Sequence, residues 1–134
     1  MVRMMRKAAL LMGLLLFWAS AALAASVDVA DTEMEFVDAW GDTGYYVDMK
    51  SLEFKGDHEV TAQVEIVCAD KDRLYLYRIH FDRKKRTYQI LDSVMAVYAT
   101  KERIGGNATP TAVTPYAAGS PMEGVVEFIF SSQP

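Results

Sequence analysis

The sequence has few of the residues from which most catalytic and metal centres are built. Its 134 residues include one cysteine, Cys68, and two histidines, His58 and His80. A single cysteine excludes an intramolecular disulfide, and these three residues lack the clustered spacing of a zinc site. The sequence also contains no glycine-rich phosphate loop after a strand and no Gly-x-Ser-x-Gly motif. We therefore expect a protein that is not an enzyme and that uses no metal and no cofactor.

Long apolar runs are missing too, with one exception at the N-terminus. Residues 8–23 are uncharged and mostly apolar, follow three basic residues, and end in the small-x-small pattern Ala-Leu-Ala at 22–24. This order predicts a signal peptide over residues 1–24, with the mature chain starting at Ala25. An uncleaved anchor is the weaker alternative, because the run is close to the minimum that spans a bilayer. We expect an exported protein, in the periplasm or on the cell surface, with no membrane span after cleavage.

Positive charge is scarce in the exported part. The whole chain has 14 basic and 18 acidic residues, a net charge of −4. Without the three basic residues of the signal peptide, 11 basic residues face 18 acidic ones, a net charge of −7. An acidic domain does not suit nucleic acid, which requires a basic face. The exported part is long enough for one domain with its own core, which we place at 36–134 after an acidic leader at 25–35.

What the sequence does have is a two-residue alternation of apolar and polar side chains between His58 and Leu91. This alternation predicts three consecutive antiparallel strands, and a slip of one residue would turn every side chain to the wrong face. The alternation gives the strands one apolar face and one more polar face. On the more polar face Gln63 lies across from Arg78 and Thr61 across from His80. The register that keeps the apolar residues together pairs Cys68 with Arg73, Ile66 with Tyr75, Val64 with Tyr77, Ala62 with Ile79, Val60 with Phe81, Phe81 with Tyr88 and Ile79 with Ile90.

The same register separates the two residues from which a cysteine nucleophile could be built. Cys68 falls on the apolar face, and His80 falls on the other face more than about 20 Å along the strands. A Cys–His pair, which needs hydrogen-bond contact, is therefore excluded. We expect Cys68 to be buried and inert.

Shorter signals flank these strands. Residues 36–48 read as a hairpin with its turn at 41–44, after which Asp48 could cap one helical turn. A further short strand is predicted at 94–98, and Gly105–Gly119 reads as a long loop because it holds three glycines and two prolines.

The start of a C-terminal helix is the clearest signal in the last third of the chain. Ser120 suits the N-cap, Pro121 the first helical position and Glu123 the return hydrogen bond of a capping box. After this cap, apolar residues follow at helical spacing, namely Met122, Val125, Val126 and Ile129. A strand over Val125–Phe130 is the alternative, because Gly124 and the β-branched residues weaken helicity.

One short basic run stands out in the acidic domain: Arg83, Lys84, Lys85 and Arg86, between the second and third predicted strands. The simpler interpretation is a solvated hairpin tip whose charges discourage aggregation between sheet edges. The alternative is a binding site that docks an acidic glycan, an acidic lipid or an acidic partner.

Four short motifs of the chain occur together in one known family. They are Tyr45-Tyr-Val-Asp48-x-x-Ser51-Leu52, Phe81-Asp82, Arg86-x-Tyr88-x-Ile90 and Gly119-Ser120. With these motifs, the chain resembles the surface-adhesin E-like family of bacterial envelope proteins over roughly Phe36 to Phe130. The resemblance implies a small antiparallel sheet crossed by a C-terminal helix, a role at the cell envelope, adhesion as known for some relatives, and a possible homodimer. Relatives can tether the helix by a disulfide, whereas here Cys68 has no partner and packing alone would hold it.

These observations predict an α+β domain, an antiparallel meander of about five or six strands with a C-terminal helix on the sheet. The leading functional hypothesis is an exported, non-enzymatic, adhesin-like binding module that takes an acidic glycan, a host component or an envelope component. The alternative is a structural or accessory subunit that a partner chain completes.

Overall fold

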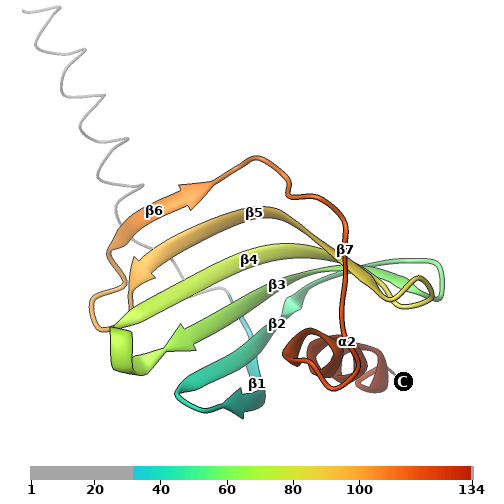
Figure 1. The fold of residues 1–134 in the computed structure, drawn as a ribbon, viewed down its shortest axis with the longest axis horizontal. Coiled ribbons are helices and arrows are strands. Elements are labelled where there is room, and N and C mark those ends of the chain that lie inside the picture. The colour runs from blue at the N-terminus through green and yellow to red at the C-terminus, as the bar shows by residue number, and fades with distance from the viewer. Residues whose placement is uncertain (1–31, 134) are drawn as a thin grey trace, which may run out of the picture.

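The computed structural model describes residues 32–133 as one antiparallel sheet with a helix across one face (Figure 1). Strands β1 to β6 lie side by side in chain order, and β7 pairs with the start of β5. The strands are β1 (Met34–Trp40), β2 (Thr43–Lys55), β3 (Glu59–Cys68), β4 (Arg73–Asp82), β5 (Thr87–Val97), β6 (Arg103–Asn107) and β7 (Thr114–Pro115), with a short 3-10 helix η1 (Ala69–Lys71) and the helix α2 (Pro121–Ser131).

The predicted meander with a terminal helix is confirmed, with seven strands rather than five or six. The predicted signal peptide, 1–24, lies outside the described residues, and so does most of the leader. Strand β1 begins at Met34, so the end of the predicted leader belongs to the sheet. Within residues 32–133, no helix has the length and apolar character needed to cross a membrane.

The predicted register of the central strands is correct throughout. Cys68 pairs with Arg73, Val60 with Phe81 and Phe81 with Tyr88, as do the pairs between them. η1 fills the four-residue connection that this register requires. The alternation therefore sets the faces of β3 and β4, and the short connection sets their pairing.

Strand β2 differs from the prediction at Asp48. The residue caps no helical turn, because β2 continues to Lys55 with a register shift between Asp48 and Glu53. The Asp48 carboxylate instead accepts hydrogen bonds from the backbone N–H groups of Lys50, at 3.0 Å, and Glu33, at 2.9 Å. It thus holds the bulge and the entry to β1 together.

The region after Leu91 also contains more strand than predicted. The short strand placed at 94–98 is the continuation of β5, which runs to Val97 with a register shift at Leu91. The segment Gly105–Gly119 is not one long loop, because the end of β6 and the whole of β7 lie within it. Its glycines and prolines suggested a loop, but two short pairings to β5 order its backbone.

Helix α2 forms as predicted, in preference to the alternative strand. The Ser120 hydroxyl accepts from the Glu123 N–H at 3.4 Å, and Pro121 occupies the first turn. The Glu123 carboxylate accepts from the N–H of Gly119, at 3.0 Å, rather than from that of Ser120. Gly119 can lie there because its φ of +77° suits glycine.

The core lies between α2 and one face of the sheet, which we call the helix face; the opposite face is the open face. The open face carries a small apolar cluster of Val67, Leu74 and Ala96, which Tyr46 contacts. The main core consists of Val47, Val60, Ala62, Val64, Ile79 and Phe81 from the sheet, Tyr116, and Val125, Val126 and Ile129 from α2.

Candidate functional site

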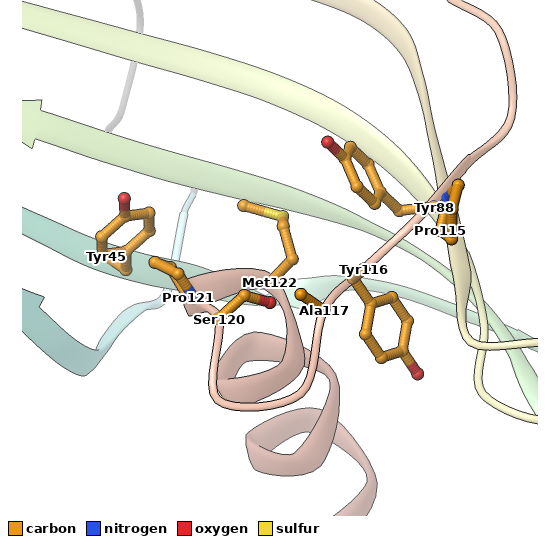
Figure 2. Close-up of a pocket in the computed structure, with 8 residues that line it drawn as sticks. All are labelled: Tyr45, Tyr88, Pro115, Tyr116, Ala117, Ser120, Pro121 and Met122. Atoms are coloured by element: carbon orange, nitrogen blue, oxygen red, sulfur yellow. The ribbon is translucent and has the colours of Figure 1, made fainter.

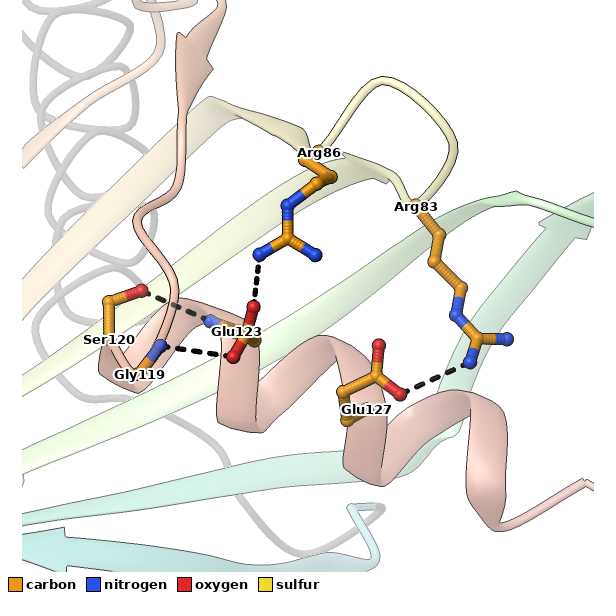
Figure 3. Close-up of polar contacts among 6 residues, drawn as sticks. All are labelled: Arg83, Arg86, Gly119, Ser120, Glu123 and Glu127. Atoms are coloured by element: carbon orange, nitrogen blue, oxygen red, sulfur yellow. Dashed lines mark hydrogen bonds and ion pairs between the residues drawn. The ribbon is translucent and has the colours of Figure 1, made fainter.

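The basic hairpin tip between β4 and β5 lies against α2 (Figure 3). Arg83 forms an ion pair with Glu127 at 3.1 Å, and its guanidinium carbon lies 5.0 Å from the ring centre of Phe130. Cation–π contacts of this kind add to the attraction between the charges. One end of the tip is thereby attached to the C-terminal half of the helix.

Arg86 makes the matching contact with the N-terminal half of α2. It forms an ion pair with Glu123, and its guanidinium carbon lies 5.2 Å from the ring centre of Tyr116. The N–H of Gly119 and the Arg86 guanidinium both lower the pKa of Glu123, in that order of size. The expectation that packing alone holds the helix is therefore wrong, because two arginines hold it as well.

The tip was also the predicted binding site, and the structure divides its four charges into two groups. Arg83 and Arg86 are engaged with acidic side chains, whereas Lys84 and Lys85 have no side-chain partner within the described part of the chain. The backbone of the turn is fixed by the Asp82 carboxylate, which accepts from the Lys85 N–H at 2.9 Å. A site for an acidic ligand would therefore rest on two lysines rather than on four charges.

A pocket of about 270 Å³ lies on the helix face beside the N-terminus of α2, and we call it the tyrosine groove (Figure 2). Tyr45 from β2 and Tyr88 from β5 stand on either side of Met122, and the Tyr116 ring points away from them. None of the lining residues is charged. The groove is lined by Tyr45, Tyr88, Pro115, Tyr116, Ala117, Ser120, Pro121 and Met122.

Burial raises the pKa of two tyrosines of the groove, Tyr45 and Tyr116, above the ordinary value. Burial is the main cause that raises the pKa of Tyr45, and the nearby Cys68 adds to it. Burial likewise raises the pKa of Tyr116. The Tyr45 phenol therefore accompanies the apolar surface of the groove, the combination for which tyrosine is used at binding surfaces, whereas the Tyr116 hydroxyl is buried.

Further aromatic residues continue the surface along the helix face. Tyr75 and Tyr77 stack in parallel in β4, with ring centres 6.0 Å apart and an interplanar angle of 2°. Pairing places Tyr75 across from Ile66, which itself pairs with Tyr45. The sequence showed these tyrosines at alternating positions, but the groove also needs residues 115–122 folded back over the sheet. No local pattern signals that approach.

The remaining reactive groups form no site. Cys68 is only half-buried, less than predicted, and its sulfur lies 3.8 Å from the Thr43 hydroxyl. His80 pairs with Glu59 at 3.2 Å on the open face, away from Cys68 as the register required. Among residues 32–133 no group of three or more histidines, cysteines and acidic residues is placed to hold a metal ion.

Comparison of the chain with protein-family models, with curated proteins and with solved structures found no match in any of the three. The relation to the surface-adhesin E-like family therefore stays a prediction from short motifs. The function has to be argued from the tyrosine groove and its surroundings.

Proposed function

We propose that the protein is an exported, non-enzymatic binding module of the bacterial envelope or cell surface, of the surface-adhesin E-like kind, and that the tyrosine groove is its ligand site. The groove itself carries this proposal. It is concave, and polar hydroxyls accompany its apolar surface. Pockets of mainly apolar character with a few polar groups are the usual form of ligand sites.

The lining indicates what part of a ligand would enter. Because no charged side chain lines the groove, a charged ligand group would lose hydration there without gaining a partner. An uncharged group with one apolar face fits better, since it can contact Met122 and Pro121 while its polar edge meets the phenol of Tyr45 or Tyr88. Such a group can belong to a larger envelope component.

The alternative function, an accessory subunit completed by a partner strand, has less support from the sheet edges. Edge strand β1 carries Glu35 and Asp38 and has a register shift beside Val37. At the other edge, β6 is only five residues long and contains Arg103. Charges, irregularities and short length are the features that discourage strand addition.

The proposal can be tested by filling the groove rather than by removing its walls. Ala117 lines the groove and is exposed, so Ala117→Trp adds bulk there without opening the core. Ala118→Trp is the matched control, because Ala118 is exposed but does not line the groove. Binding of the secreted protein to isolated cell-envelope fragments should fall with Ala117→Trp and stay unchanged with Ala118→Trp.

The hairpin-tip hypothesis is tested in the same assay. Neutralising Lys84 and Lys85 to Gln leaves the contacts of Arg83 and Arg86 with α2 intact. If the tip docks an acidic ligand, binding should weaken in this variant and at high salt, because exposed charges are screened. Binding that survives both changes but is lost in Ala117→Trp supports the groove. Full binding by Ala117→Trp would refute it.

A further inference from the structure

The open face of the sheet has a polar hollow around Gln63 in β3 and Arg78 in β4, which pair across the two strands. Two adjoining depressions meet at these residues. One, of about 170 Å³, also involves Glu53 and Thr61, and the other, of about 120 Å³, extends to Asp92. The hollow lies on the face opposite α2 and shares no residue with the tyrosine groove.

Two strand irregularities border the hollow. In β2 the register shifts between Asp48 and Glu53, and the Ser51 hydroxyl fixes this bulge by donating to the Asp48 carbonyl at 2.6 Å and accepting from the Gln63 N–H at 2.7 Å. In β5 the extra residue Leu91 shifts the register at the same row of the sheet. Bulges bend a strand and redirect its side chains, and they recur beside functional sites.

The polar groups of the hollow retain unused hydrogen-bonding capacity. Nε and one terminal nitrogen of Arg78 both contact Oδ2 of Asp92, at 2.8 and 2.7 Å. In the described part of the chain, the other terminal nitrogen of Arg78 and the Oδ1 of Asp92 have no partner. The same holds for the side chains of Gln63, Thr61 and Glu53. Donors and acceptors thus stand side by side on a fixed backbone.

We propose that this polar hollow is a second binding site, which recognises the vicinal hydroxyl groups of a neutral sugar. A hydroxyl both donates and accepts, so it matches a surface on which guanidinium, amide and carboxylate groups alternate. Glu53 and Asp92 repel an anionic ligand, and Arg78 repels a cationic one. The partly apolar side of the hollow, formed by Leu76 and Val94, can contact the C–H face of a sugar ring.

The test uses defined neutral oligosaccharides: maltohexaose, fully N-acetylated chitohexaose and mannohexaose, with a hyaluronan hexasaccharide as the acidic comparison. Each is titrated into the secreted protein by calorimetry at low and high salt. We expect saturable binding of at least one neutral sugar, with little salt dependence. Arg78→Met should weaken that binding about tenfold or more, because a hydrogen bond from a charged donor is lost.

Matched variants make the result decisive. Gln63→Leu should weaken sugar binding as well, and thermal unfolding of both variants verifies that they remain folded. Ala117→Trp, which fills the tyrosine groove, should leave sugar binding unchanged. The proposal is overturned if no neutral sugar binds, if only the hyaluronan fragment binds, or if Ala117→Trp abolishes binding while Arg78→Met does not. The last result would assign the sugar to the groove and leave the proposed function standing.

Discussion

The docking of α2 predicts two alanine substitutions with opposite effects on stability. Ile129 is fully buried between α2 and the sheet. Ile129→Ala removes the equivalent of about three methylene groups, each worth about 0.8 kcal/mol on burial, and leaves a cavity. We expect the free energy of unfolding to fall by about 2–5 kcal/mol.

Gly124, one and a half turns earlier on the same helix, is exposed, and a Cβ added to it would meet no atom within 4 Å. Gly124→Ala removes the entropic cost of a mid-helix glycine at no steric cost. It should raise the free energy of unfolding by about 0.5–1 kcal/mol.

Urea unfolding followed by circular dichroism measures both changes. In thermal unfolding, each kcal/mol should move the midpoint by about 4–8 °C for a domain of this size. A neutral Ile129→Ala would mean that α2 is not docked in solution. A destabilising Gly124→Ala would mean that the residue needs a conformation other than the helix. Either result would refute the reasoning.

Three more predictions concern the tip and the thiol. Changing Arg83 and Arg86 together to Gln should speed hydrogen exchange of the α2 amides, since both guanidinium contacts are lost, and high salt should reduce the difference from the wild type. The hydrogen bond from the Lys85 N–H is the largest cause that lowers the pKa of Asp82. The stability that this carboxylate contributes is therefore present above its ordinary pKa and is lost as the pH falls through the lowered value. When the free energy of unfolding is measured at a series of pH values, Asp82→Asn should reduce the loss of stability at acid pH, and an unchanged loss would contradict the assignment. Cys68, being half-buried, should react with a thiol reagent more slowly in the native protein than in denaturant, and equal rates would contradict its place on the helix face.

The central strands and the terminal helix were predictable because their signals are local. Alternation over β3 and β4 places Val64 and Tyr77 on the apolar side, and the short connection at 69–72 then selects the register that pairs them. The helix start was equally local, since Ser120, Pro121 and Glu123 lie within four residues. These elements can be predicted because the residues that specify them are close together in the sequence.

The bulges could not be predicted in this way. The alternation in β2 continues to Asp48, after which β2 takes up three more residues than β3 before Glu53 pairs again. Their placement depends on the Ser51 hydroxyl, which donates to the Asp48 carbonyl in the same strand and accepts from the Gln63 N–H in the neighbouring strand, rather than on side-chain periodicity. The alternation placed Gln63 across from Arg78, but the polar hollow around them could not be predicted, because it also depends on this bulge. Asp48 suggested a helix cap because a capping carboxylate and a bulge-binding carboxylate carry the same local signal.

The contacts between the tip and α2 were hidden by sequence distance, although a hint existed. Glu123 and Glu127 are four residues apart and so lie on one side of the helix, facing outward from the apolar stripe. These two acidic groups match the two arginines at the ends of the tip. Arg83 is 44 residues before Glu127 in the sequence, and Arg86 is 37 residues before Glu123. A search for charge complementarity between predicted elements would have found the pairing.

These contacts also connect the basic hairpin tip to the tyrosine groove. The carbonyl of Arg86 accepts from the Tyr116 N–H at 3.1 Å, and its guanidinium lies over the Tyr116 ring. Tyr116 belongs to the segment that walls the tyrosine groove, and Glu123 lies one residue after Met122 in the groove. Arg86 is thus a positioning residue for the groove, so its loss should weaken binding of even an uncharged ligand. Under the proposed function, the basic tip would affect binding through the shape that it gives the groove, rather than through attraction of an acidic partner.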